Sequence, residues 1–241
     1  MKPLKVLGIL GGPRQGSCHY FLEQAVSVLE DLPFPTELES YSLRGKQMQP
    51  CIACHKCTTN GGVCILKDQF EELRQLWINA DVIIYAFPVF AQGVPGQLKC
   101  FIDRLGNSFY GKYEVGSMRH MKAIVPLTVG AHLFGGQELA MNQIIQHAIL
   151  LNSIPVAGDG PNSYIGAPAW TRNDLSRDAL KKLAENGDED TKISLAAAKS
   201  AVRRGVEVAA MLRSGADVLH DALVQDVRYR PYLQRIREEN A

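Results

Sequence analysis

The fold is decided by the stretch Asp81-Val82-Ile83-Ile84-Tyr85-Ala86-Phe87, which is the clearest strand signal in the sequence. A short apolar run of this kind is typical of a strand buried on both faces of a parallel sheet. A loop at 88–95 follows, and the next residues place Leu98, Phe101, Ile102 and Leu105 at helical spacing. A strand, a loop and a helix in this order predict a βα unit.

The same alternation extends on both sides of this unit, through about 160 residues. Further strands are predicted at 6–10, 37–41, 121–129 and 153–157, and further helices at 17–31, 68–79 and 137–151. Five βα units predict an α/β fold with a flavodoxin-like, doubly wound, five-stranded parallel sheet. Ligands of such sheets lie at the carboxyl ends of the strands, so we expect the loops after the first, third and fourth strands to hold a cofactor.

The sequence is expected to divide into two parts. Residues 1–160 are predicted to form the flavodoxin-like domain, including a cysteine-rich insertion at 48–66 after the second strand. Residues 161–241 are predicted to form a C-terminal loop and helical extension, which belongs to the same domain or contacts another subunit. A loop over the sheet edge is expected at 158–173, and a helix with one apolar side at 191–214.

Neither the net charge nor the hydropathy of the sequence gives a reason to expect nucleic acid or a membrane as a partner. The 241 residues carry 26 Lys and Arg against 25 Asp and Glu, so neither nucleic acid nor an anionic membrane is an expected partner. No apolar run approaches the roughly 20 residues that a membrane-spanning helix needs. Met1-Lys2-Pro3 leads directly into a strand instead of a secretory signal, so we expect a cytoplasmic protein with reduced cysteines.

Four of the six cysteines, Cys51, Cys54, Cys57 and Cys64, fall within fourteen residues. In the spacing C-x2-C-x2-C-x6-C, three thiolates at three-residue steps and a fourth after a flexible Thr-Thr-Asn-Gly-Gly segment can meet at one centre. Each cysteine can bind a different iron of a [4Fe-4S] cluster. We therefore expect these four cysteines to act together, with an iron–sulfur cluster as the first hypothesis.

Two other interpretations of the four cysteines stay open. Zinc sites more often use two separated C-x2-C pairs or mixed Cys and His ligands, and His55 would then be a substitute ligand. The thiols are otherwise reduced or redox-active and hold no metal. A disulfide between Cys51 and Cys54 is disfavoured because the two residues are too close in the chain for an easy bridge.

A second motif, Gly11-Gly12-Pro13-Arg14-Gln15-Gly16-Ser17-Cys18-His19, follows the first strand. Its glycines permit a tight turn, and a helix that begins near Ser17 points free backbone N–H groups at the loop. Arg14 and the Ser17 hydroxyl add donors that suit a phosphate. The segment is neither a Walker loop nor a full G-x-G-x-x-G fingerprint, which disfavours ATP and a Rossmann-bound dinucleotide. A thiol at a helix N-terminus has a lowered pKa, so Cys18 is also a candidate reactive thiol.

Together these motifs resemble the NADPH-dependent FMN reductase branch of the flavodoxin-like proteins. The first loop is similar to that of the family, and so is Phe87–Arg104, in which a Pro-x-aromatic turn precedes a Leu-Lys-x-Phe-x-Asp-Arg helix. The four-cysteine insertion after the second strand resembles the iron–sulfur flavoproteins of that branch. The resemblance covers roughly residues 4–157.

The resemblance implies three loops that bind FMN and four cysteines that bind the cluster. The FMN residues are Arg14, Gly16, Ser17, Cys18 and His19 at the phosphate; Pro88, Val89, Phe90, Ala91, Gln92 and Gly93 along the isoalloxazine edge; and Gly130, Ala131, His132, Gly135 and Gly136 beside the flavin. The cluster ligands are Cys51, Cys54, Cys57 and Cys64. Gly12 stands where the family often has serine, and Cys18-His19 where it often has Asn-Thr, so some phosphate contacts of the family are absent here.

The activity implied is that of an FMN-dependent oxidoreductase that passes electrons between NAD(P)H or ferredoxin and an acceptor, through FMN and a [4Fe-4S] cluster. One alternative is an NAD(P)H-dependent FMN or quinone reductase without a cluster, whose cysteines bind zinc or nothing. The other is a non-catalytic electron carrier or redox sensor. No catalytic base or nucleophile is expected, because the redox chemistry belongs to the cofactors. The expected assembly is a homodimer or homotetramer, with ferredoxin or a small quinone or flavin acceptor as partner.

Backbone amides are expected to tune both cofactors. An unpaired N–H of the 89–93 turn is expected near the flavin N5 atom, and the N–H groups of Asn60-Gly61-Gly62 are expected to donate to cluster sulfurs. Hydrogen bonds to the sulfurs raise the reduction potential of such a cluster.

Overall fold

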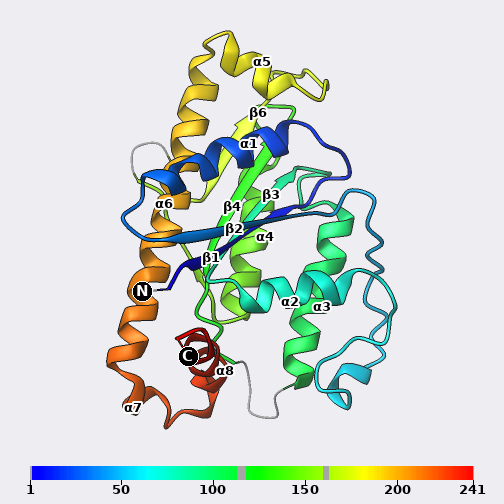
Figure 1. Ribbon diagram of the computed structural model, residues 1–241. Helices are drawn as coiled ribbons and strands as arrows, with labels where there is room; N and C mark the ends of the chain where they lie inside the picture. The colour runs from blue at the N-terminus through cyan, green and yellow to red at the C-terminus, as the bar shows by residue number, and fades with distance from the viewer. Residues whose placement is uncertain (1, 113–117, 160–162, 241) are drawn as a thin grey trace.

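The computed structural model describes residues 2–112, 118–159 and 163–240 (Figure 1). Its strands are β1 (Leu4–Leu10), β2 (Thr36–Ser42), β3 (Val82–Pro88), β4 (Ala123–Gly130), β5 (Ile154–Pro155) and β6 (Ala167–Trp170). Its α-helices are α1 (Ser17–Val26), α2 (Phe70–Asn79), α3 (Gly96–Lys112), α4 (Gln137–Leu150), α5 (Ala179–Glu185), α6 (Glu189–Val218), α7 (His220–Leu223) and α8 (Arg230–Asn240). Short 3-10 helices are η1 (Ser27–Asp31), η2 (Lys56–Thr58) and η3 (Val227–Tyr229).

The strands form one parallel sheet in the order β2-β1-β3-β4-β5, which confirms the predicted doubly wound, flavodoxin-like arrangement. β1 pairs with β2 on one side and with β3 on the other. The chain therefore moves outward from β1 to β2 and then returns across β1 to β3. This reversal leaves a crevice at the carboxyl ends of β1 and β3, where ligands bind in sheets of this type.

Both faces of the sheet are covered by helices, α1 and α6 on one face and α2, α3 and α4 on the other (Figure 1). Side chains of a strand alternate between its two faces, so β3 needs apolar residues at every position. Its first six residues are all fully buried. Val82, Ile84 and Ala86 belong to the core on the first face, and Ile83, Tyr85 and Phe87 to the core on the second.

The fifth strand differs from its prediction. The predicted strand at 153–157 is reduced to Ile154–Pro155, and the predicted loop at 158–173 contains a further strand, β6. β6 pairs in parallel with the Leu127–Gly130 half of β4. β5 pairs only with the first half of β4, so this edge would otherwise have no neighbouring strand. Buried backbone N–H and C=O groups need partners, and β6 supplies them although its sequence, Ala-Pro-Ala-Trp, has no β-branched residue to reveal a strand.

The residues after β6 return to the same sheet. α5 was not predicted, and α6 is longer than the predicted helix at 191–214. α6 begins after Asp188, whose side chain accepts a hydrogen bond from the Thr191 N–H at 2.9 Å, as an N-cap does. Ala198 and Ala201 of α6 are fully buried, and these small side chains let the helix approach the sheet closely beside α1. None of the helices within the described ranges is both long and apolar enough to cross a membrane.

Candidate functional site

A cavity of about 370 Å³ lies at the carboxyl ends of β1, β3 and β4, as the strand order predicts. The loops after these three strands form its walls, and the segment after β6 closes it. The residues that line the cavity are Gly12, Pro13, Arg14, Gly16, Ser17, Cys18, Pro88, Val89, Phe90, Val129, Gly130, Ala131, Thr171, Asp174, Leu175 and Ser176. We call it the β1–β3 cavity.

The first loop of this cavity has the groups that a phosphate requires. The N–H groups of Ser17 and Cys18, at the start of α1, have no acceptor among the described residues, as expected of the first turn of a helix. Arg14 adds a positive charge on the same loop. A phosphate in the β1–β3 cavity would therefore meet free N–H donors and a cation, so this loop fits the FMN phosphate.

A segment that the sequence did not predict holds this loop in place. The Arg14 Nη2 donates to the carbonyl of Leu175 at 3.0 Å, and the Ser17 hydroxyl lies 3.5 Å from the carbonyl of Arg177. The backbone of Arg177 also lies so close to Gly16 that an added Cβ would be 3.0 Å from its carbonyl oxygen. These contacts span about 160 residues of sequence, and no local motif at 171–177 signals them.

The second loop of the cavity is a tight two-residue turn. The Phe90 N–H donates to the Gly93 carbonyl at 3.0 Å, and the Gly93 N–H donates back to Phe90 at 2.9 Å. Ala91 and Gln92 between them have φ of 47° and 63°, the left-handed conformation that such turns require. Their N–H groups have no acceptor in the described part of the chain. A turn of this kind fits the donor expected near the flavin N5 atom.

The third loop places only its first residues in the cavity. Gly130 and Ala131 line it, while His132, Gly135 and Gly136 lie outside. The Gln137 Nε2 donates to the His132 carbonyl at 2.7 Å, and the His132 Nδ1 contacts Asn173 Oδ1. Gly136 packs against the Gln92 backbone, where a Cβ would approach Cα to 2.6 Å. These residues therefore contact the second and third loops on the side away from the cavity and stabilise their conformation.

Two residues of the first loop differ from their predicted roles. His19 does not line the cavity, because its Nδ1 accepts a hydrogen bond from the Gly16 N–H at 3.4 Å. Cys18 lines the cavity, but burial raises its pKa to about 12 although Arg14 opposes the shift. The hypothesis of a reactive thiol at this helix N-terminus is wrong, because desolvation outweighs the favourable position.

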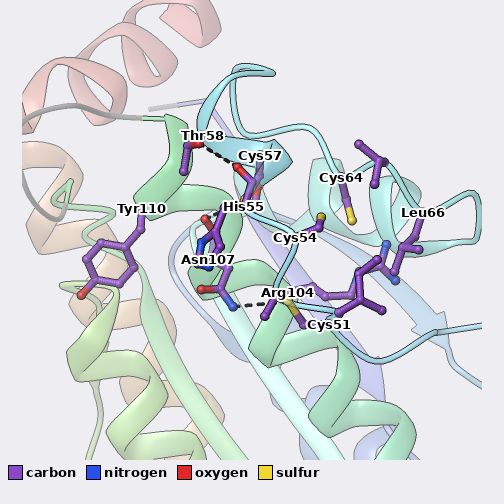
Figure 2. Close-up of a pocket in the computed structure, with 14 residues that line it drawn as sticks. Cys51, Cys54, His55, Cys57, Thr58, Cys64, Leu66, Arg104, Asn107 and Tyr110 are labelled. Carbon is purple, nitrogen blue, oxygen red and sulfur yellow. Dashed lines mark hydrogen bonds between the residues drawn. The ribbon is translucent and has the colours of Figure 1, made fainter.

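The four clustered cysteines line a second cavity, of about 160 Å³, which we call the cysteine cavity (Figure 2). Cys51, Cys54, Cys57 and Cys64 come from the insertion between β2 and α2, and α3 forms the opposite wall. Figure 2 shows the sulfurs of Cys54 and Cys64 turned toward the same space. All six cysteines are free, so no disulfide joins these residues. No group of three Cys, His, Asp or Glu side chains within the described ranges is placed to hold a single metal ion.

Left-handed residues shape the cysteine insertion. Ala53 and His55, on either side of Cys54, have φ of 49° and 56°, and Gly61 and Gly62 precede Cys64 with φ of 57° and 84°. Because these conformations turn the chain sharply, the insertion folds back on itself and its thiols line one space. His55 lines the cavity too, so the structure keeps it beside the thiols.

The sulfurs perturb one another. Burial, together with the neighbouring sulfurs of Cys64, Cys51 and Cys54, raises the pKa of the Cys57 thiol. A cationic centre between them would offset this repulsion and favour the thiolates that bind metal. Four thiols around one cavity, with no carboxylate among its lining residues, therefore fit an iron–sulfur cluster.

Residues of α3 contact the cysteines, and sequence reasoning missed them. The Asn107 Nδ2 lies 3.6 Å from the Cys51 sulfur, and the Cys57 thiol lies 3.5 Å from the Asn107 carbonyl. Arg104, which the sequence placed in a flavin-associated helix, also lines the cysteine cavity. The helical repeat was a usable signal, because Arg104, Asn107 and Ser108 are three and four residues apart and share one side of the helix.

The expected amide donors of the insertion are partly used elsewhere. The N–H groups of Asn60 and Gly62 both donate to the Cys57 carbonyl, at 3.4 and 2.9 Å. They close the turn between the third and fourth cysteines. The prediction that these two amides donate to cluster sulfurs is therefore wrong, since the tight turn needs them.

α3 connects the two cavities. It begins at Gly96, just after the loop that lines the β1–β3 cavity, and reaches the cysteine cavity with Arg104 and Asn107. At 1.5 Å per residue, Gly96 and Asn107 are about 16 Å apart along the helix axis. The two cavities are therefore distinct sites, and α3 leads from the loop at the first cavity to the wall of the second.

Comparisons with known proteins indicate the family of the chain. Residues 4–161 match the family described as NADPH-dependent FMN reductase. An iron–sulfur flavoprotein of Archaeoglobus fulgidus is 34% identical over 170 residues, which cover 70% of this chain and 84% of that protein. An iron–sulfur flavoprotein of Methanocaldococcus jannaschii is 32% identical over 190 residues, which cover 79% of this chain and 91% of that protein.

Solved structures share the fold at lower identity. An NAD(P)H:quinone oxidoreductase from Methanothermobacter marburgensis superposes with a TM-score of 0.59 at 16% identity, over 83% of this chain and 98% of that one. An azoreductase from Bacillus anthracis gives a TM-score of 0.54 at 16% identity, over 82% of this chain and 98% of that one. Both similarities show a common fold.

Proposed function

The chain belongs to the NADPH-dependent FMN reductase family, in its iron–sulfur flavoprotein branch, and we propose from this that it passes electrons through FMN and a [4Fe-4S] cluster. The family makes it an FMN-dependent oxidoreductase. NAD(P)H or ferredoxin is the proposed donor, and a small quinone or flavin, or a protein partner, the proposed acceptor.

FMN is proposed to occupy the β1–β3 cavity, where it supplies the ability to take a hydride as an electron pair and to release electrons singly. The first loop would bind the phosphate through the N–H groups of Ser17 and Cys18 and the charge of Arg14. The second loop would lie along the ring, with Val89 and Phe90 excluding water. Burial of Cys18 keeps its thiol protonated, so it adds no negative charge beside the phosphate.

The cluster is proposed to be held by Cys51, Cys54, Cys57 and Cys64. The observation that carries the proposal is that all four thiols line one cavity, although they are spread over fourteen residues of sequence. A cluster bound there would allow one-electron exchange. Asn107 would orient the first and third ligands, because it contacts both sulfurs.

The test is an anaerobic purification followed by iron and sulfide analysis and a visible spectrum. We expect about four irons per chain and a broad absorbance near 400 nm over the flavin bands. Cys57→Ala should lose this absorbance and most of the iron while keeping FMN. Cys100→Ala is the matched control, because Cys100 lies on α3 but does not line the cysteine cavity.

Two other results would replace this proposal. Flavin without iron, with steady NAD(P)H turnover of quinone or free flavin, would make the protein a simple reductase whose cysteines hold zinc or nothing. Cluster and flavin without turnover of any donor and acceptor would make it a carrier or redox sensor.

A homodimer or homotetramer is also proposed. Large apolar side chains are exposed around a further cavity of about 440 Å³ beside the third loop, which supports burial of this surface between subunits: Leu133, Phe134, Leu139 and Ile193. Light scattering at micromolar concentration tests the assembly, and a monomer there would refute it.

A further inference from the structure

Arg104 is a buried cation at the edge of the cysteine cavity. Its side chain is 1% exposed and lies midway along α3. Within the described residues, Nη1 donates to three acceptors: to Asp68 Oδ2 at 2.6 Å, to the Gln49 carbonyl at 3.2 Å and to the Met48 sulfur at 3.9 Å. The guanidinium is therefore anchored through a single corner.

The other two nitrogens, Nε and Nη2, are buried and have no acceptor among the described residues. Leaving a buried charged donor without an acceptor is unfavourable, and native proteins rarely do so. Two such N–H groups on one side chain at a cavity wall indicate an acceptor inside the cavity. The thiols around that cavity indicate that the acceptor is sulfur.

The orientation of Arg104 is fixed from two sides. Its guanidinium stacks on the Phe70 ring, with the central carbon 4.2 Å from the ring centroid. Asp68, whose side chain is fully buried, holds the Nη1 corner and also accepts from the N–H groups of Gln49 and Phe70, at 2.8 and 3.2 Å. Because Asp68 balances the charge, the cavity meets mainly the two oriented N–H dipoles.

The sulfur of Cys64 lies near the guanidinium group of Arg104. Burial acts to lower the pKa of Arg104, but the hydrogen bond to Asp68 and the nearby sulfur of Cys64 raise it overall. Figure 2 shows the Arg104 side chain extending from α3 toward the space in which Cys54 and Cys64 face each other.

We infer that Arg104 donates hydrogen bonds from Nε and Nη2 to sulfur atoms of the cluster and thereby raises its reduction potential. This inference rests on the proposed cluster. Donors to cluster sulfurs stabilise the reduced form, which carries more negative charge. The alternative is that Arg104 only anchors Asp68 and the loop segment at 48–50.

Arg104→Lys separates these roles. Lysine keeps a positive charge for Asp68 but loses the planar fork, so anchoring is largely kept while the two donors are lost. Arg213→Lys is the matched control, since Arg213 is equally buried, pairs with Asp81 at 3.1 Å and lies on α6, away from the cysteine cavity.

The experiment is a redox titration of the anaerobically purified holoprotein, followed by electron paramagnetic resonance, with iron and sulfide counted in each variant. We expect Arg104→Lys to keep its iron and to hold about tenfold less reduced cluster at a fixed potential, a shift of about 59 mV downward. Arg213→Lys should titrate like the unaltered protein. An unchanged potential in Arg104→Lys would overturn the inference.

A second measurement decides the matter if Arg104→Lys fails to hold a cluster. In unaltered protein labelled with 15N-arginine, pulsed electron paramagnetic resonance of the reduced cluster should detect coupling to an arginine nitrogen, because Arg104 lines the cavity. Absence of that coupling would refute the hydrogen bonds. Absence of iron from the unaltered protein would instead refute the proposed function, and the inference with it.

Discussion

Residues in the left-handed backbone region occur in the loops of both cavities. Ala53 and His55 flank Cys54, and Ala91 and Gln92 form the turn after β3. For residues other than glycine this conformation costs about 1–3 kcal/mol each, so it persists only where the surrounding contacts enforce it. The loops around both cavities are therefore held in shape before any cofactor binds.

Gly16 tests the contact between the first loop and the segment at 171–177. In Gly16→Ala the new Cβ would lie 3.0 Å from the Arg177 carbonyl oxygen, so the two segments must separate and the β1–β3 cavity widens. We expect FMN to bind about tenfold more weakly, a loss of about 1.4 kcal/mol. Quenching of FMN fluorescence by apoprotein measures it. Gly96→Ala is the control, because an added Cβ there meets nothing within 4 Å.

His147, on α4, predicts a pH dependence of stability. Burial is the main cause that lowers its pKa to about 4, and the histidine of the unfolded chain titrates near 6.5. Below pH 6.5 the unfolded chain binds the proton and the folded chain does not, so stability falls as the pH drops toward 4.

Between pH 7 and pH 5 this residue should lower the free energy of unfolding of the apoprotein by about 2 kcal/mol. Urea denaturation at the two pH values measures it. In His147→Gln the loss should shrink by that amount, and an equal loss in both proteins would show that other groups cause it.

At the scale of elements, β6 links the sheet to the segment that closes the β1–β3 cavity. It pairs with the carboxyl half of β4, so the residues that follow it, Thr171 to Arg177, emerge at the edge where FMN is proposed to bind. The chain enters β6 through Gly166, which has φ of +53°. An added Cβ at Gly166 would lie 2.0 Å from the Pro126 carbonyl oxygen.

Gly166→Ala should therefore displace β6. The left-handed conformation alone costs roughly 1 kcal/mol for alanine, and the clash with β4 backbone adds to it, so we expect a loss of at least about 3 kcal/mol. Gly45→Ala is a matched control, because Gly45 has φ of +72° but nothing within 4 Å. Thermal unfolding of both variants measures the difference, and similar losses would show that β6 is not held by this contact.

At the scale of the whole molecule, Asp81 ties the C-terminal helices to the start of β3. Its buried carboxylate pairs with Arg213 of α6 at 3.1 Å and with Arg235 of α8 at 2.8 Å. It also accepts from the Lys5 N–H at 2.9 Å. The two arginines and this N–H hold its pKa below the ordinary value although burial acts to raise it.

Asp81→Asn should destabilise the protein by about 3–5 kcal/mol, because it leaves two arginines without their carboxylate. Loss of α8 from the fold should appear as faster hydrogen exchange in that helix. Asp226→Asn is the control, since Asp226 pairs with Arg228 at the surface and its loss should change stability little. Equal effects of the two substitutions would contradict a buried ionic cluster.

The fold was largely predictable because its signals are local. The apolar run at 82–87 marks a strand buried on both faces, and the alternation of strands and helices gives the sheet order. β6 was not predictable, because three of the four residues of Ala-Pro-Ala-Trp are of types depleted in strands, and the segment forms a strand beside the unpaired edge of β4. α5 is likewise too short to show a clear period.

The candidate sites divide in the same way. The sequence by itself determined the four cysteines and the loops after β1 and β3, because cysteine spacing and glycine-rich turns are properties of adjacent residues. Only the tertiary structure decided that Arg104 and Asn107 border the cysteines, that residues 171–176 close the other cavity, and that Cys18 stays a neutral thiol. These features depend on burial and on contacts between residues far apart in the chain, which the folded packing alone brings together.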